Sequence, residues 1–374
     1  MIPRSIQNIV TKTLLESDKI IIILGPRQAG KTTLIDEIQK NLPCQKDKIL
    51  KLNCDVEEDF SVVNTTSLQN LENLLRNKSF LIIDEVQRLS NPGLTLKIIH
   101  DNFKFIKLLV TGSSSFEIKN KMSDALTGRY YDFTLLPFSY SEINQFGDRT
   151  LESILTYGEY PEVFLENKPD YKKAQLAKIV ESFLFKDILS YSRIRSSEAL
   201  INLARAVAFQ IGSELNENEL SSRVKIDRKT LLSYLDILEK SFVIKRLHPY
   251  SQNPRREIGR RYKVYFVDLG IRNQLIGQFG PLSIREDYGR LWENFLVIER
   301  FKKLSSGLTT TPSYFWRNLN GSEVDYLEIV DGNVKGYEFK LNTAKKIKFP
   351  KTFTETYHNT PELINPENFN KFVI

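Results

Sequence analysis

Two glycines, a lysine and a threonine near the start of the chain have the spacing of a phosphate-binding loop. In KIIIILGPRQAGKTTLIDEI, Gly25, Gly30, Lys31 and Thr32 fit the pattern G-x-x-x-x-G-K-T between an apolar run and a helix-like segment. Glycines let backbone N–H groups turn toward phosphate oxygens, and a helix beginning near Lys31 points its positive end at them. The lysine reaches the β- and γ-phosphates, and the threonine hydroxyl ligates Mg²⁺. We therefore predict a site for ATP and Mg²⁺, with nucleotide-binding residues Gly25, Gln28, Ala29, Gly30, Lys31, Thr32 and Thr33.

An acidic pair ends a second apolar run, in SFLIIDEVQRL. The run from Phe80 to Ile83 predicts a buried strand, followed directly by Asp84 and Glu85. Asp84 can hold Mg²⁺ through its water shell, and Glu85 can polarise the attacking water as the catalytic base. The alternative is a strand that merely ends in surface acids.

Two more polar positions are candidates to contact the γ-phosphate. The run KLLVTGSSS ends in hydroxyl residues, of which Ser113 is our first choice and Thr111 our second for a polar sensor. Gly-Ser-Ser is also ordinary loop composition. Arg129, in DALTGRYYDF, can act as an arginine finger on the transferring phosphoryl group. A structural arginine paired to a carboxylate is the equally weighted alternative.

These motifs require a scaffold of repeated strand–helix units. Strands are predicted at 20–24, 49–53, 80–83 and in KLLVTGSSS, with helices beginning near Lys31 and over 68–76. Such alternation, with motifs at the strand ends, predicts an α/β fold whose parallel, doubly wound sheet binds its ligand at the carboxyl ends of the strands. We assign this ATPase domain to residues 1–140.

Helical periodicity dominates the next region, which we delimit as 141–263. Within it, a short helix at 217–224 capped by Asn216, a turn, a longer helix at 228–240 and a strand at 242–247 predict a helix-turn-helix with a wing. The wing tip SQNPRREIGRR carries four arginines suited to gripping DNA phosphates, Arg255, Arg256, Arg260 and Arg261. The alternative is a module that docks protein.

The stretch VDYLEIVDGNVKGYEFKL reads as two strands joined at Asp331-Gly332, because Asp-Gly between alternating apolar residues is a strong hairpin signal. A two-residue turn pairs residues whose numbers sum to 663, which sets Asp325 against Glu338. Like charges facing each other destabilise a sheet. A divalent cation between them, Mg²⁺ or Mn²⁺, resolves this conflict and can activate water.

Two further side chains complete this predicted nuclease-type constellation. Lys340 lies two residues after Glu338, hence on the same strand face, where it can steady the water or the leaving charge. Glu293 lies among apolar residues of the helical pattern YGRLWENFLVIERFKKL and can point inward as a third metal ligand. The alternative is a surface ion pair between Glu323 and Lys340, worth about 0–1 kcal/mol. We assign this α/β domain to residues 264–374.

The composition indicates an ordinary globular protein. The 374 residues are 41% hydrophobic and 26% charged, and no apolar run is long enough to cross a membrane. The N-terminus does not resemble a signal peptide, and Cys44 and Cys54 form no metal pattern, so we expect free thiols in the cytoplasm. The net charge is +7. Between Asn216 and Lys263 the chain has twelve Lys and Arg residues and six Asp and Glu residues. This basic stretch suggests an anionic partner.

The chain resembles a large bacterial and archaeal family that joins an AAA-superfamily ATPase domain to a winged helix and a restriction-endonuclease-like domain. The matching stretches are LGPRQAGKTTL, LIIDEVQR, VTGSSS, LTGRYYDFTLLPFS, YGEYPEVF, KVYFVDLGIRNQLIG, WENFLVIE and FWRNLNGSEVDYLEI. The resemblance implies ATP hydrolysis through Gly30, Lys31, Thr32, Asp84 and Glu85. It also implies a nuclease-like face formed by Glu293, Asp325, Glu338 and Lys340. We assign no second sensor arginine of the AAA type, so oligomerisation stays open.

Two functional hypotheses follow from these motifs. The first is an ATP-dependent enzyme acting on DNA, in which nucleotide state controls the winged helix and the nuclease-like module. The second is a nucleotide switch that cleaves nothing and uses hydrolysis to release a protein or DNA partner.

Overall fold

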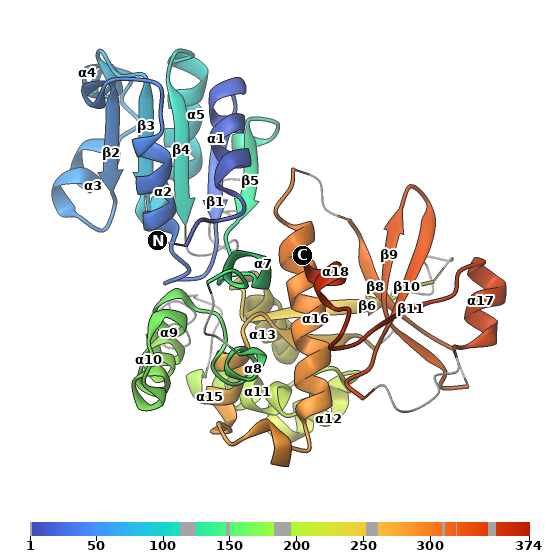
Figure 1. Cartoon of the computed structure of the whole chain (residues 1–374). Coiled ribbons are helices and arrows are strands. Elements are labelled where there is room, and N and C mark those ends of the chain that lie inside the picture. Colours follow the sequence, from blue (N-terminus) through green and yellow to red (C-terminus); the bar gives the residue numbers. More distant parts are fainter. Residues whose placement is uncertain are drawn as a thin grey trace. The chain divides into compact units, whose positions relative to one another are not determined.

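The computed structural model describes residues 2–112, 125–146, 150–182, 196–251, 261–308, 311–318, 320–342 and 349–374. The chain divides into two compact units, which Figure 1 shows in sequence colours. The first is Met1–Phe138, with the short segments Lys240–Phe242 and Ser305–Leu308. The second comprises the rest of the chain from Ser139 to Ile374. Each unit has its own sheet.

The first unit contains a five-stranded parallel sheet in the order β2-β3-β4-β1-β5. Its strands are β1 (Ile20–Leu24), β2 (Ile49–Asn53), β3 (Phe80–Asp84), β4 (Lys107–Gly112) and β5 (Tyr130–Thr134). β1 and β3 are buried along their whole length, as expected for strands covered on both faces. The predicted parallel α/β sheet is confirmed.

Helices cover both faces of this sheet: α1 (Gln7–Glu16), α2 (Lys31–Lys40), α3 (Glu57–Val63), α4 (Leu68–Leu75) and α5 (Pro92–Asn102). Successive strand residues point to opposite faces. Ile21 and Ile23 therefore pack with α1 and α2, whereas Ile20, Ile22 and Leu24 pack with α3, α4 and α5. This double winding leaves the carboxyl ends of the strands for the loops that carry the polar motifs.

The second unit begins with helices, as the periodicity predicts: α7 (Tyr140–Ile143), α8 (Leu151–Tyr157), α9 (Pro161–Leu165), α10 (Pro169–Glu181) and α11 (Ser197–Ala208). α12 (Glu217–Val224) and α13 (Arg228–Lys240) follow with the predicted bounds. Asn216 caps α12 by accepting from the Glu219 N–H, and Asp227 caps α13 through the Thr230 N–H at 3.0 Å. No helix in the described ranges is long and apolar enough to span a bilayer.

The second unit also contains a six-stranded mixed sheet in the order β11-β10-β9-β8-β6-β7. Its strands are β6 (Ile244–Pro249), β7 (Lys263–Phe266), β8 (Ser313–Arg317), β9 (Glu323–Val330), β10 (Asn333–Phe339) and β11 (Glu362–Ile364). β6 pairs antiparallel with β7, in the predicted order after α13, and parallel with β8. Regions 141–263 and 264–374, which we expected to be separate domains, therefore share one sheet and one unit.

The hairpin between β9 and β10 has the expected register. Val330 pairs with Asn333 and Tyr326 with Tyr337, so paired numbers sum to 663. Asp331 and Gly332 have φ of 50° and 78°, as the mirror-image turns of two-residue hairpins require. The predicted turn is confirmed, and its register directs Asp325 toward the strand segment that carries Glu338.

The long helix α16 (Tyr288–Leu304) matches its predicted pattern residue for residue and packs against β7, β10 and the C-terminal helix α18 (Asn370–Val373). The amide of buried Asn294 accepts from the Phe266 N–H and donates to the Phe266 C=O, both at 2.8 Å. Farther along the helix, Arg300 forms a two-bond ion pair with Glu328 of β9 at 2.6 and 2.8 Å. The helix is therefore bonded to the sheet at two positions, Asn294 and Arg300. The other helices of this unit are α15 (Leu269–Ile276) and α17 (Lys351–Tyr357).

Replacing Asn294 by alanine should destabilise the second unit. The substitution leaves the N–H and the C=O of fully buried Phe266 without their side-chain partner. Each buried polar group left unsatisfied costs about 1–3 kcal/mol, so we expect a loss of about 2–5 kcal/mol in the free energy of unfolding, measured by urea denaturation. Asn333→Ala at the exposed hairpin is the control and should change it by less than about 0.5 kcal/mol. Equal stability of the two variants would contradict a stabilising role for the hydrogen bonds between Asn294 and Phe266.

Candidate nucleotide site and carboxylate cluster

The loop between β1 and α2 has a backbone suited to phosphate. Gln28 and Gly30 both have left-handed φ, 60° and 93°, which turns successive N–H groups into the loop. Gly25 is required sterically, because an added Cβ would lie 2.0 Å from the Leu135 carbonyl oxygen. α2 begins at Lys31, so its first N–H groups lie at this loop.

Lys31 is the predicted phosphate ligand and is only 5% exposed. Its Nζ donates to the carbonyl oxygens of Gly25 and Pro26, at 2.9 and 3.0 Å. A buried ammonium group held on the loop carbonyls keeps a positive charge beside the inward-turned N–H groups. The donor set of the loop therefore fits the phosphates of a nucleotide.

Asp84 joins three elements at the end of β3 and is 2% exposed. Its Oδ2 accepts from the Thr32 hydroxyl of α2 at 2.7 Å, and its Oδ1 accepts from the Thr111 hydroxyl of β4. Thr111 accepts in turn from the Glu85 N–H at 3.2 Å. A hydroxyl beside a carboxylate is the oxygen ligand pair that Mg²⁺ takes in nucleotide sites, so these residues fit the ion.

Glu85 has a left-handed backbone, with φ of 55° and ψ of 46°, directly before the short 3-10 turn η2 (Val86–Arg88). A non-glycine residue in this region is strained, and such strain clusters at functional sites. The Glu85 carboxylate accepts a hydrogen bond from the Gln87 side chain. The backbone turn therefore directs Glu85 differently from Asp84, as two separate roles would require.

The other two predicted positions of this site have different outcomes. Ser113 lies outside the described residues. Arg129 is in a two-bond ion pair with Asp101, at 3.0 and 3.2 Å. Its hydrogen bonds, followed by one from His100, lower the pKa of Asp101 to about 2. This geometry matches the structural alternative for Arg129, and a role on the phosphoryl group would require it to leave Asp101.

The second group of predicted residues meets on the sheet of the second unit. Glu293, on α16, accepts from Lys263 Nζ at 2.9 Å and from the Tyr265 hydroxyl at 2.7 Å, both on β7. Burial, followed by the charge of Glu293, raises the pKa of Tyr265, so this hydroxyl stays protonated and donates. Glu293 therefore does point inward, as predicted from its apolar neighbours.

Asp325 and Glu338 lie close enough to repel each other. Burial, the charge of Glu293 and then that of Glu338 raise the pKa of Asp325 to about 7. Asp325 accepts from the Phe339 N–H at 2.8 Å, and Lys340 pairs with Glu338 at 2.7 Å. The Oε2 atom of Glu338 is buried and has no hydrogen-bond partner among the residues that the structure describes. The predicted opposition of two acids is thus present.

Among the described residues, the acids of this cluster outnumber the cations that pair with them. Five carboxylates are linked through three cations: the acids are Glu214, Glu293, Glu323, Asp325 and Glu338, and the cations are Lys263, Arg317 and Lys340. Glu323 pairs with Lys263 and lies 3.7 Å from Arg317, so the alternative pair with Lys340 is not the one formed. The excess negative charge and the orphaned Glu338 oxygen fit a divalent cation. Within the described ranges, however, no three His, Cys, Asp or Glu side chains are arranged around a common metal position. Lys263 lies between Glu293 and Glu323, and Lys340 lies between Asp325 and Glu338.

Sequence reasoning missed Lys263 and Tyr265. Both alternate with Val264 and Phe266 on β7, so the signal was present in YKVYFVD as a polar face on a short strand. Its neighbour Glu293 is on a helix that follows later in the chain, so the contact depends on how α16 packs on β7.

Protein-family models match three consecutive parts of the chain. Residues 17–144 match the family described as AAA domain. Residues 148–282 and 288–373 match two families described as domains of unknown function, DUF8612 and DUF4143. The loop, Thr32, Asp84, Thr111 and Glu85 all lie in the first match. The chain is therefore similar to AAA domains over residues 17–144.

The relatives that match most of the chain are described as uncharacterised proteins. An uncharacterised protein of Mycobacterium tuberculosis is 26% identical over 88% of this chain and 71% of its own length. One from Haemophilus influenzae is 24% identical over 77% of this chain and 76% of its own length.

Solved structures give weaker likenesses. AMPPCP-bound DnaA from Aquifex aeolicus has a TM-score of 0.32 at 15% identity, covering 62% of this chain and 86% of that one. Pif1 helicase from Candida albicans has 0.29 at 19% identity, covering 48% of each. Scores of this size do not establish a shared fold.

The raised pKa of Asp325 predicts a stability that depends on pH when metal is chelated. A carboxyl with a raised folded-state pKa binds its proton more tightly in the folded protein, so its contribution is complete below about pH 4 and is lost as the pH rises through about 7. Asp325→Asn should remove this loss and stabilise the protein at pH 8, by an amount on the order of a few kcal/mol, but not at pH 4. Urea unfolding in EDTA at both pH values measures it. Asp331→Asn, in the exposed turn, is the control. Parallel pH profiles for wild type and Asp325→Asn would exclude the raised pKa.

Proposed function

We propose that the first unit binds and hydrolyses ATP with Mg²⁺. The observation that carries this proposal is the contact of Thr32 and Thr111 with the two oxygens of buried Asp84, beside a loop that holds the buried ammonium of Lys31. The AAA-domain match of residues 17–144 supports the same assignment. Lys31 and the loop N–H groups, from Gly25 to Thr33, bind the phosphates.

The polar residues at the strand ends have separate roles in the proposed hydrolysis. Thr32 and Asp84 would hold Mg²⁺, which supplies positive charge to the phosphate oxygens when bound. Glu85 orients the attacking water as its base, and Thr111 or Ser113 senses the γ-phosphate. Arg129 is a further candidate, as an arginine finger. To contact the phosphoryl group it would first have to break its ion pair with Asp101.

We further propose that nucleotide state controls how the second unit engages DNA. The order α12, α13, β6 and β7, together with the excess of basic residues between Asn216 and Lys263, supports a winged helix that grips the DNA backbone. Arg261 is exposed and lies two residues before β7 begins at Lys263. Its partners in the prediction, Arg255, Arg256 and Arg260, lie outside the described residues.

The carboxylate cluster is the proposed nuclease-like site. Asp325 and Glu338 would hold Mg²⁺ or Mn²⁺, which supplies an activated water and neutralises the developing charge. Glu293 would join them by exchanging its contact with Lys263, while Lys340 steadies charge on the phosphate. The lysines now placed between the acids favour the alternative function, an ATP-driven switch that binds and releases a protein or DNA partner without cleavage.

Two substitutions test the ATP site. Lys31→Ala removes the buried ammonium and should abolish tight ATP binding, measured by calorimetry. Glu85→Gln keeps the shape of the side chain but not the base, so it should bind ATP and turn it over at least about 10²-fold more slowly. Lys40→Ala, at the exposed end of the same helix α2, is the control for both. Wild-type affinity in Lys31→Ala, or wild-type turnover in Glu85→Gln, would remove that residue from the mechanism.

A cleavage assay separates the two functional hypotheses. Wild type and an Asp325→Ala/Lys340→Ala variant are incubated with ATP, Mg²⁺ or Mn²⁺, and plasmid or single-stranded DNA. Cleavage by wild type alone supports the nuclease-like site. If neither protein cleaves while both hydrolyse ATP at equal rates, the switch is the better description.

A further inference from the structure

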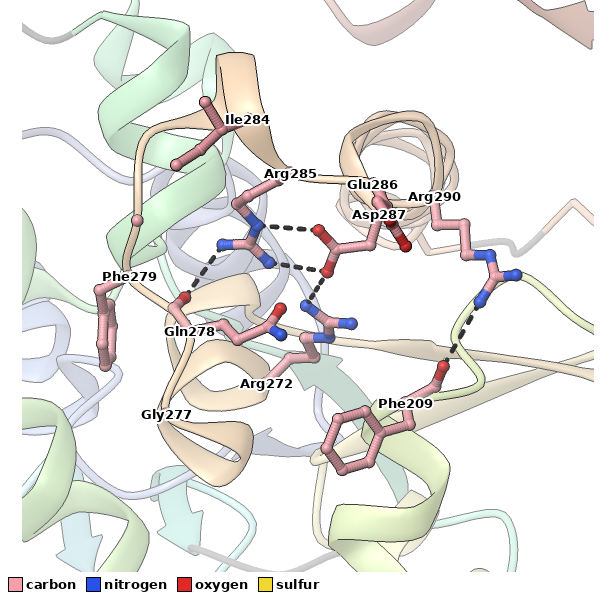
Figure 2. A pocket seen from close by; sticks show the side chains of 11 residues that line it. Phe209, Arg272, Gly277, Gln278, Phe279, Ile284, Arg285, Glu286, Asp287 and Arg290 are labelled. Atoms are coloured by element: carbon pink, nitrogen blue, oxygen red, sulfur yellow. Dashed lines mark hydrogen bonds and ion pairs between the residues drawn. The ribbon is translucent and has the colours of Figure 1, made fainter.

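A second, strongly basic pocket lies in the second unit, apart from the carboxylate cluster. It has a volume of about 680 Å³, within the range of small-molecule sites. Figure 2 shows its lining, which comes from the end of α11, from α15 and the turn after it, and from the start of α16. Three arginines face it: Arg272, Arg285 and Arg290.

Two of these arginines are fixed by the half-buried Asp287 and the buried Asn273. Asp287 accepts from Arg285 at 2.8 Å through each oxygen, and also from Arg272 Nη1. Asn273, which is fully buried, accepts from both guanidinium groups at 3.0 Å. Despite its burial, Asp287 has a pKa lowered to about 2 by these arginines, so it remains charged. The pocket floor is therefore rigid and preorganised.

The arginines nevertheless carry more positive charge than their partners neutralise. Burial, and then the charges of Arg285 and Arg290, lower the pKa of Arg272 despite its pairing with Asp287. The Nη2 group of Arg272 makes no hydrogen bond to the described residues. Arg290 is exposed, and within the described part of the chain its side chain makes only one long contact, 3.4 Å, to the Phe209 carbonyl oxygen. Uncommitted guanidinium N–H groups thus remain on two residues.

An aromatic ring also lines the pocket. Phe209 is 53% exposed although it lines the pocket, and it follows directly on Ala208, whose carbonyl oxygen accepts from Arg272 Nε at 2.8 Å. Figure 2 shows the Arg290 guanidinium bonded to the Phe209 backbone carbonyl oxygen, while the Phe209 ring turns away from Arg290. Exposed aromatic rings bind nucleobases by stacking, and guanidinium groups bind phosphates with two parallel hydrogen bonds.

We propose that this pocket binds a nucleoside 5′-phosphate, with the phosphate on Arg290 and Arg272 and the base against Phe209. The exposed guanidinium of Arg290, together with the Nη2 group of Arg272, a residue that is 2% exposed, favours a doubly charged phosphate over a single carboxylate. The other acid facing the pocket is Glu286, which is exposed and forms no ion pair within the described residues. It reduces the positive potential without occupying the arginines. The ligand is a free mononucleotide or the 5′ end of a nucleic-acid strand, since both present the same group.

Calorimetry on full-length Lys31→Ala protein tests the pocket without a contribution from the ATP loop, and does not depend on ATP hydrolysis or DNA cleavage. The probes are thymidine 5′-monophosphate, thymidine, inorganic phosphate, benzoate, and a short oligothymidylate with and without a 5′-phosphate. We expect saturable binding of the monophosphate or of the phosphorylated strand, and none of thymidine. Binding of the monophosphate identifies a free nucleotide, and binding of the phosphorylated strand alone identifies a strand end.

Three exposed positions on the Lys31→Ala background give effects of known sign. Arg290→Ala should weaken the phosphate-bearing ligand at least about tenfold, because a charge-assisted hydrogen bond is lost. Phe209→Ala should weaken it while leaving inorganic phosphate unchanged, and Glu286→Gln should tighten both. Arg205→Ala, an exposed arginine on α11 that does not line the pocket, is the control.

The proposal is overturned if no phosphate-bearing probe binds saturably, or if Arg290→Ala and Arg205→Ala bind equally well. Benzoate binding as tightly as the monophosphate would overturn the assignment of a phosphate. Because every arm uses protein with a disabled ATP loop, these outcomes are independent of the proposed ATPase site. The comparison of Arg290→Ala with Arg205→Ala separates the pocket from the carboxylate cluster, which both variants leave unchanged.

Discussion

Helix α16 is held by buried polar contacts, and the position of the functional side chains in the second unit depends on them. Asn294 binds both backbone groups of Phe266, and Arg300 forms its two-bond pair with Glu328. Near the end of the helix, Lys302 lies between Glu299 and Glu159. A buried charge or amide without its partner costs several kcal/mol, so these contacts allow only one rotation and one axial position of the helix.

That single position serves two different surfaces. Glu293 faces Lys263 and Tyr265 on β7, and Arg290, one turn earlier, faces the basic pocket. Residues three apart on a helix lie on neighbouring parts of one face, roughly 5–6 Å apart at Cβ. One helix therefore contributes a residue to the acidic cluster and a residue to the basic pocket. A rotation of α16 would disturb both together.

The proposed nucleotide site is built on a different principle. Its loop residues follow one another in the chain, so their geometry is fixed by local turns such as those at Gln28 and Gly30. Asp84 adds the tertiary part, because its two oxygens join α2 to β4 through Thr32 and Thr111. This arrangement requires only that neighbouring parallel strands end together, which the order β3-β4-β1 ensures. The site thus depends on a few short-range constraints.

The sequence by itself determined the parts of this protein that follow from local chemistry. Apolar runs and caps specified β1, α13 and α16, the Asp331-Gly332 turn set the register of β9 and β10, and the loop spacing located the nucleotide site. Only the tertiary structure decided that the strands after α13 join the C-terminal sheet, that Arg129 pairs with Asp101, and that Lys263 enters the carboxylate cluster. It also assembled the basic pocket from three separate segments. Periodicity and turn propensity act over a few residues, whereas these contacts join residues far apart in the chain. Such contacts depend on strand order and helix packing, and no local pattern in the sequence encodes either of them.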